Sequence, residues 1–328
     1  MATQQMPSQT LLGPTPEGVA DAAAKIAQLL PKTPLIEAAV NGTPVWFKAE
    51  SLQPVGAFKI RGAWHRLTDL TEAERARGVV GVSSGNHAQG VAWAARRLGI
   101  AATIVMPVDA PKTKIEATRG YGANVVLYDR PGGENRVLVA QKLIEQSGAT
   151  LVHAYGDPWV IDGQGTTGIE IVAQLAERGL DGPTRIVCPC GGGGLTAGLA
   201  LACPDAEIVP VEPEGWDDVR LSLEKGEIVP VPDMKFPTQC DALQTPATWP
   251  INFAVLKARV ARGYAVTAAE VRTAQRWAFS NLHLVVEPGG AAALAAVLAG
   301  KVPVDGRTAV VLSGGNTDPD AFAKVLSE

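Results

Sequence analysis

Short runs of apolar and β-branched residues alternate along the chain with segments whose apolar positions recur at helical spacing. The apolar runs lie at residues 78–84, 100–107, 124–129, 184–190, 206–213 and 308–315. The helical patterns lie at residues 87–99, 110–122 and 195–203. Strands that alternate with helices of this length are typical of βαβ units. The sequence therefore predicts the α/β class, with mainly parallel sheets flanked by helices on both faces.

The stretch from about residue 72 to residue 156 contains a self-sufficient series of strand–helix pairs. No long polar linker separates this stretch from the rest of the chain, so short crossings would have to join two domains. We therefore expect two intertwined domains: a large one formed by residues 1–71 and 157–328, and a small one formed by residues 72–156.

Composition narrows the classes of function. The 328 residues are 46% hydrophobic and 19% charged, which fits a globular enzyme with an ample core. The formal net charge is −4 and no basic run stands out, so nucleic acid is not an expected partner. No apolar run reaches the roughly 18 residues of a membrane span, and the N-terminus lacks the pattern of a signal peptide. We expect a cytoplasmic protein with no membrane partner.

Lys59 stands where a loop turns into a helix, in the stretch Gly-Ala-Phe-Lys-Ile-Arg-Gly-Ala. Pro54 and Gly56 are typical of a loop, and apolar residues recur at helical spacing after Lys59. Most lysines are solvated surface charges, but an amine at a helix start beside the ring of Phe58 is partly desolvated. Desolvation and the positive end of a helix both lower the pKa of an amine. The sequence therefore predicts that Lys59 is a usable nucleophile.

Three further stretches place small or polar residues where predicted strands end. Residues 83–90 open a helix whose N–H groups, together with Asn86, can bind a carboxylate; a helix cap explains them equally well. Four glycines at 191–194 can cradle a phosphate, and a purely structural turn is the alternative. No Walker loop or dinucleotide fingerprint accompanies them, which favours a small phosphorylated cofactor. Ser313 presents its hydroxyl at a strand end, where α/β proteins bind ligands.

Together, these stretches supply a lysine for a Schiff base, a phosphate cradle, a carboxylate-binding helix start and a hydroxyl for a ring atom. This set matches the needs of pyridoxal 5'-phosphate (PLP). From about residue 30 to residue 318, the chain resembles the fold type II PLP enzymes of the serine/threonine dehydratase and serine racemase family. The resemblance implies that the large domain binds PLP and that the small domain closes over the substrate.

The resemblance also implies roles for single residues. Lys59 would carry the cofactor with Phe58 beside its ring, Asn86 would contact the phenolic oxygen, and Ser313 would face the pyridine nitrogen. The residues that would hold the phosphate are Gly191, Gly192, Gly193, Gly194 and Leu195. The residues that would bind the substrate carboxylate are Ser83, Ser84, Asn86 and His87. Ser84 also matches the opposite-face acid and base of serine racemase, and helix capping is its alternative role.

Residues 211–219, Val-Glu-Pro-Glu-Gly-Trp-Asp-Asp-Val, are similar to the divalent-cation site of serine racemase and related dehydratases. The resemblance implies three ligands: Glu212, the carbonyl of Trp216 and Asp218. Ligation by oxygen alone suits magnesium, calcium or manganese. A solvated acidic turn is the alternative interpretation.

The family implies a PLP-dependent ammonia-lyase that takes a small amino-acid substrate, L-threonine or L-serine, and yields a 2-oxo acid and ammonia. A 3-hydroxyaspartate dehydratase is one alternative, because Arg136 matches an arginine that can reach the active site, where it would suit a second carboxylate. A solvated helix arginine is the other interpretation of this residue. Serine racemase is a second alternative, and a β-replacement enzyme of the same fold fits the stretch after residue 286 less well. The family also implies a homodimer.

Overall fold

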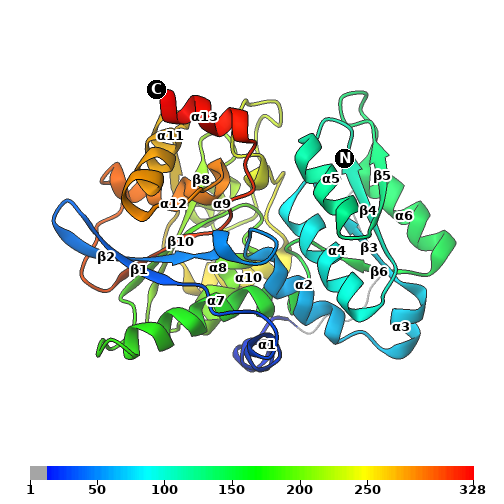
Figure 1. Cartoon of the computed structure of the whole chain (residues 1–328), viewed down its shortest axis with the longest axis horizontal. Coiled ribbons are helices and arrows are strands. Elements are labelled where there is room, and N and C mark those ends of the chain that lie inside the picture. The colour runs from blue at the N-terminus through cyan, green and yellow to red at the C-terminus, as the bar shows by residue number, and fades with distance from the viewer. Residues whose placement is uncertain (1–12) are drawn as a thin grey trace.

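The computed structural model describes residues 13–328 and arranges the strands in two separate sheets (Figure 1). The larger sheet has the order β1-β2-β10-β7-β8-β9. Its strands are β1 (Leu35–Val40), β2 (Thr43–Ala49), β10 (Thr308–Leu312), β7 (Arg185–Pro189), β8 (Glu207–Pro213) and β9 (Tyr264–Val266). β1 pairs with β2 in antiparallel orientation, and all other neighbours in this sheet are parallel.

The smaller sheet has the order β5-β4-β3-β6 and is parallel throughout. Its strands are β3 (Val79–Val82), β4 (Ala102–Pro107), β5 (Asn124–Tyr128) and β6 (Thr150–Val152). With its helices it forms a smaller lobe, seen on the right of Figure 1, and the larger sheet with its helices forms the larger lobe. The predicted α/β class, with mainly parallel sheets, is confirmed.

Helices cover both faces of each sheet. In the smaller lobe they are α3 (Glu72–Arg77), α4 (Asn86–Leu98), α5 (Lys112–Gly120) and α6 (Arg136–Ser147). Along the larger lobe they are α1 (Pro16–Ala27), α2 (Lys59–Thr68), α7 (Pro158–Ala176), α8 (Gly194–Ala202), α9 (Asp218–Lys225), α10 (Pro250–Arg259), α11 (Ala268–Trp277), α12 (Pro288–Leu298) and α13 (Pro319–Ser327). α2 packs against both α4 and α7, so it lies where the two lobes meet.

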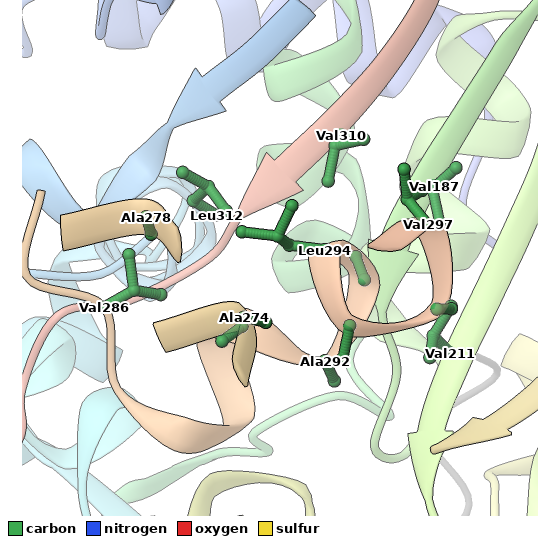
Figure 2. Packing of buried hydrophobic residues seen from close by; sticks show 14 of the residues in the cluster. Val187, Val211, Ala274, Ala278, Val286, Ala292, Leu294, Val297, Val310 and Leu312 are labelled. Carbon is green, nitrogen blue, oxygen red and sulfur yellow. The ribbon is translucent and has the colours of Figure 1, made fainter. Parts of the chain in front are cut away.

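Alternation along β10 divides the larger core into two layers. Successive strand side chains point to opposite faces. Val310 and Leu312 therefore pack on the side of α12, where Figure 2 shows Leu294 pointing toward them. Ala309 and Val311 pack on the other side, in the cluster that includes α8. Both faces of the strand are buried, as expected for the centre of a parallel sheet.

The smaller sheet is built from residues 79–152, and the larger sheet from residues 35–49 and 185–312. The division into domains at residues 71/72 and 156/157 stays a prediction, and residues 1–12 of the large domain lie outside the described residues. The four cysteines are all buried. Within residues 13–328, every helix is too short or too polar to span a bilayer.

Candidate active site between the two lobes

A cavity of about 670 Å³ lies at the carboxyl ends of β3, β7 and β10 and has walls from both lobes. This is the edge of parallel sheets where α/β proteins bind ligands. The residues predicted to bind cofactor or substrate all line it: Phe58, Lys59, Ser83, Ser84, Asn86, His87, Arg136, Gly191, Gly192, Gly193, Gly194, Leu195 and Ser313. The structure therefore brings together side chains and loops that are up to about 250 residues apart in the sequence.

Lys59 is the first residue of α2, and its amine faces this cavity. Its Nζ donates a hydrogen bond to the carbonyl of Ala154 at 2.8 Å and lies 5.1 Å from the centre of the Phe58 ring. Burial lowers the pKa of Lys59 to about 8, while Cys190 acts in the opposite direction. The prediction that desolvation lowers this pKa is confirmed, and the amine is partly neutral near pH 7.

Arg61 anchors the first turn of α2 beneath Lys59. Its guanidinium is completely buried and donates hydrogen bonds to Glu50 at 2.7 Å and to Glu170 at 2.8 Å. A planar guanidinium held by two carboxylates has one fixed orientation. This ion cluster limits how far the start of α2, and with it the amine, can shift.

The four glycines form the turn between β7 and α8. Gly193 has φ of +86°, a left-handed conformation that favours glycine. A Cβ atom at Gly192 would lie 2.3 Å from the ring of Tyr155, so the ring packs directly on the turn. The first N–H groups of a helix have no acceptor within the helix, and those of α8 begin at Gly194 beside the cavity. A turn without side chains, followed by a helix N-terminus, fits the phosphate of PLP.

The loop after β3 leads into α4, which begins at Asn86. Gly85 leaves room for a neighbouring side chain, because a Cβ there would lie 2.8 Å from Cδ of Lys114. His87 is buried, its Nε2 lies 3.0 Å from the carbonyl of Val152, and burial lowers its pKa to about 3. The imidazole is therefore neutral and forms part of the cavity wall.

A largely buried polar cluster, which we call the Glu287 cluster, adjoins this loop and consists of Asn86, Lys114, Asp241 and Glu287. Asn86 donates a hydrogen bond to Glu287, and the Lys114 ammonium lies 2.6 Å from Asp241 and 3.3 Å from Glu287. Burial by itself would lower the pKa of Lys114, but the nearby carboxylates of Glu287 and Asp241 have the larger combined effect and raise this pKa. Sequence reasoning missed Lys114, Asp241 and Glu287 as site residues, because nothing local connects residues so far apart.

Arg136 is the first residue of α6 and lines the cavity from the smaller lobe. Burial lowers the pKa of His153 to about 4, and the charge of Arg136 adds to this effect. His153 in turn packs its ring 4.6 Å from Tyr155 and 4.8 Å from Trp249, measured between ring centres. The guanidinium is thus a positive group in the same cavity wall as these rings, and its charge acts on His153.

The three predicted cation ligands lie outside this cavity, at the end of β8. Glu212 is completely buried, and its carboxylate oxygens accept hydrogen bonds from the N–H groups of Val219 at 3.0 Å and Arg220 at 2.8 Å. The carboxylate thus caps the first turn of α9, which is a structural role that the sequence did not reveal. Trp216 is buried in the turn between β8 and α9.

One carboxylate oxygen of Asp218 accepts a hydrogen bond from the N–H of Thr248 at 2.7 Å. The second oxygen is buried and has no hydrogen-bond partner among residues 13–328. Burial raises the pKa of Asp218 to about 7. Burial also raises the pKa of Glu212 well above its usual range, and the negative charge of Asp218 adds to this shift. Two buried carboxyls with an unpaired oxygen fit a divalent cation. No group of three or more His, Cys, Asp or Glu side chains within residues 13–328 is arranged to hold a metal, so such a site would need backbone carbonyls.

Comparison with known proteins agrees with this geometry. Residues 26–314 match the family model described as "Pyridoxal-phosphate dependent enzyme". The chain is 38% identical to serine racemase of Schizosaccharomyces pombe, over 98% of this chain and 100% of the relative. It is 39% identical to L-threo-3-hydroxyaspartate ammonia-lyase of Pseudomonas sp, over 94% of this chain and 97% of the relative.

Solved structures give the same result. A threonine deaminase from T.th. has a TM-score of 0.84 and 40% sequence identity, and the match covers 93% of this chain and 99% of that one. Maize serine racemase has a TM-score of 0.88 and 32% identity, with coverage of 96% and 98%. With its cavity-facing lysine and its glycine turn, and with a family match over most of its length, this chain belongs to the pyridoxal-phosphate-dependent enzymes.

Proposed function

We propose that the protein is an ammonia-lyase that removes water from a 3-hydroxy amino acid, L-threonine or L-serine, and releases a 2-oxo acid and ammonia. The observation that carries this proposal is the amine of Lys59, which has a pKa of about 8 and faces a cavity that also contains the glycine turn. PLP, when bound, supplies an electron sink that stabilises negative charge at the α-carbon of an amino acid. The relatives named above as ammonia-lyase and threonine deaminase support this reaction.

The residues that would hold PLP are those that line the cavity around Lys59. The turn from Gly191 to Leu195 would bind the phosphate, Asn86 the phenolic oxygen and Ser313 the ring nitrogen, with Phe58 beside the ring. Ser313 is a hydroxyl and not a carboxylate, so it would leave the ring nitrogen largely unprotonated. We expect this weaker electron sink to favour elimination or racemisation over transamination.

Lys59 would act as the base that removes the α-proton of the substrate. With a pKa of about 8, roughly a tenth of the amine is neutral at pH 7, which is far more than for an exposed lysine. Ser83, Ser84 and the N–H groups up to His87 would bind the substrate carboxylate. Ser84 lies on this loop and would be the acid and base on the opposite face if the protein racemises its substrate.

A 3-hydroxyaspartate is the second candidate substrate, and Arg136 is the observation that favours it. A guanidinium in the cavity wall suits a second carboxylate, which L-threonine and L-serine lack. The relative from Pseudomonas sp is named for that substrate. Serine racemase activity is a third candidate, since one relative and one solved structure carry that name.

Three further properties belong to the same proposal. Glu212, Asp218 and the carbonyl of Trp216 would bind magnesium, calcium or manganese; the buried unpaired oxygen of Asp218 supports this. Residues 72–156 would move as a small domain that closes over the substrate. We also propose that the protein is a cytoplasmic homodimer, by analogy with its family.

The test is an assay of ammonia and 2-oxo acid with PLP and magnesium, which compares L-serine, L-threonine and the 3-hydroxyaspartate stereoisomers by kcat/KM. We expect equal amounts of the two products. If the wild type prefers hydroxyaspartate and Arg136→Ala loses that preference, Arg136 binds the second carboxylate of the substrate. Arg119→Ala, on the exposed end of α5, is the control and should keep the preference. Formation of D-serine without ammonia, or reaction only when a thiol is added, would contradict the lyase proposal.

A further inference from the structure

The segment that follows β10 connects three parts of the candidate site. Its backbone pairs with the loop before Lys59: the N–H of Phe58 donates to the carbonyl of Ser313 at 3.1 Å, and the N–H of Gly315 donates to the carbonyl of Gly56 at 2.8 Å. The N–H of Glu287 donates to the carbonyl of Gly314 at 3.0 Å. The residue at the end of this segment is Asn316, to which the predictions from the sequence assigned no role.

The side-chain nitrogen of Asn316 donates two hydrogen bonds. One goes to the backbone carbonyl of Val55 at 2.8 Å, and the other goes to the side-chain oxygen of Asn86 at 2.9 Å. A carbonyl can only accept, so the end of the Asn316 amide that faces Val55 must be the nitrogen. The same nitrogen faces Asn86, and the group that it meets there must be the oxygen.

The other end of the Asn86 amide is its nitrogen, which donates one of its two protons to Glu287. Hydrogen bonds therefore fix both ends of the Asn86 amide: its oxygen accepts from Asn316 and its nitrogen donates to Glu287. A rotation that exchanges the oxygen and the nitrogen would break both bonds. Asn86 also lines the cavity. The second proton of its nitrogen is the one that remains for a bound molecule.

Two glycines provide the space that this arrangement needs. A Cβ atom at Gly56, where φ is +70°, would lie 2.3 Å from the side-chain oxygen of Asn316. A Cβ at Gly314 would lie 2.3 Å from a carboxylate oxygen of Glu287 and 3.1 Å from the nitrogen of Asn86. Both positions exclude a side chain because the amides and the carboxylate fill the space.

We propose that Asn316 is a positioning residue that turns the amide of Asn86 so that an N–H group, and not the oxygen, faces the cofactor. The inference deepens the function proposed above and rests on its assignment of Asn86 to the phenolic oxygen of PLP. A donor stabilises negative charge on that oxygen, whereas an amide oxygen in the same place would repel it. Asn316 does not touch the cofactor in this proposal and acts through Asn86 alone.

The experiment measures the dissociation constant of PLP and the visible absorption spectrum of the holoenzyme for Asn316→Asp and Asn316→Ala. In Asn316→Asp, a carboxylate replaces the donor, so the Asn86 amide lies between two carboxylates and no longer has one preferred orientation. We expect the dissociation constant to rise about 10-fold or more, with a change in the visible band, and a smaller effect of the same kind for Asn316→Ala. Asn281→Asp is the matched control, because Asn281 is exposed and its side-chain nitrogen donates to the carbonyl of Trp277, away from the cavity; it should leave both quantities unchanged.

A double-mutant cycle separates this role from a purely structural one. In the background of Asn86→Ala, Asn316→Asp should cause no further change in the spectrum. A spectral change of equal size without Asn86 would overturn the proposal, as would an unchanged spectrum and dissociation constant in both Asn316 variants. If Asn316→Asp does not fold, judged by melting of the cofactor-free protein, Asn316→Ala decides. Failure of the wild type to release ammonia would contradict the proposed function only, since the spectra do not depend on turnover.

Discussion

The ammonium group of Lys114, in the smaller lobe, lies 2.6 Å from the carboxylate of Asp241, in the larger lobe. The same ammonium lies 3.3 Å from Glu287, so one cation holds two carboxylates of the opposite lobe at the wall of the cavity. Lys114 and Glu287 are buried, while the Asp241 side chain is 31% exposed. The contact therefore joins the lobes through one buried and one partly solvated ion pair.

We expect Lys114→Met to lower the free energy of unfolding by about 3 kcal/mol, because Glu287 would lose the cation that compensates its buried carboxylate. Asp241→Asn should cost about 1 kcal/mol or less, since water already screens that pair. Urea unfolding of the cofactor-free protein measures both, and Lys112→Met on the exposed face of α5 is the control. Equal losses for Lys114→Met and Lys112→Met would show that the ion cluster adds nothing.

Replacing Lys59 by alanine should abolish covalent attachment of PLP and lower activity by about 10³-fold or more, because both the nucleophile and the base are removed. Reduction of the holoenzyme with borohydride, followed by peptide mass analysis, measures the attachment. Lys112→Ala, which replaces an exposed lysine, is the control and should keep both the covalent attachment of PLP and the activity. A reduced adduct in Lys59→Ala would assign the Schiff base to another residue.

The lowered pKa of Lys59 predicts the pH dependence of cofactor uptake. Only the neutral amine attacks an aldehyde, and its fraction rises with pH through the pKa of about 8. The rate of uptake by the cofactor-free protein should therefore increase with pH and level off above a midpoint near 8. Stopped-flow absorbance measures this rate. A midpoint near the usual value of about 10.4 would show that burial does not change this amine.

Magnesium should raise the melting temperature of the cofactor-free protein, because a cation that binds only the folded state stabilises it. The expected gain is several degrees at saturating metal. Asp218→Asn keeps an acceptor for Thr248 but removes the charge, so it should abolish the gain. Asp181→Asn, at a side chain that is 98% exposed, should keep it. Equal stabilisation of all three proteins would exclude the proposed ligands.

Gly193→Ala should lower the affinity for PLP and also the stability of the fold. The residue has φ of +86°, which an alanine adopts only with strain of about 1–2 kcal/mol. A Cβ there would also lie 2.9 Å from Leu256. Gly300→Ala is a control with similar strain, φ of +69° and no neighbour within 4 Å. A loss of PLP affinity that is equal in both variants would contradict a phosphate cradle at residues 191–194.

Local patterns were enough to predict the alternation of strands and helices, the start of α2 at Lys59 and the glycine turn. Each depends on neighbours in the sequence: apolar spacing, a loop glycine or a helix start. The position of β10 between β2 and β7 could not be predicted in this way, because it depends on packing between residues more than 100 apart. The antiparallel pair of β1 and β2 was not predicted either.

The same distinction applies to the site. Asn86 and Ser313 stand next to glycines at element boundaries, and Lys59 follows Gly56 by three residues at the start of a helix, which is a signal that a sequence shows. Lys114 and Glu287 are 173 residues apart, and each alone is an ordinary charged residue of a helix start. Only the fold makes them a pair, since burial converts two surface-type side chains into an ion pair with a structural role.

The place of β10 has a consequence for biosynthesis. This strand lies between β2 and β7 and is followed by the segment that pairs with the loop before Lys59, yet it is made after nearly all the rest of the chain. When translation has reached residue 300, the strands on both sides of β10 have been synthesised but the strand between them has not. Until β10 is inserted, Ser313 and Asn316 are missing from the cavity and its surroundings, so the residues that we propose for the pyridine nitrogen and for orienting Asn86 are the last parts of the site to assemble.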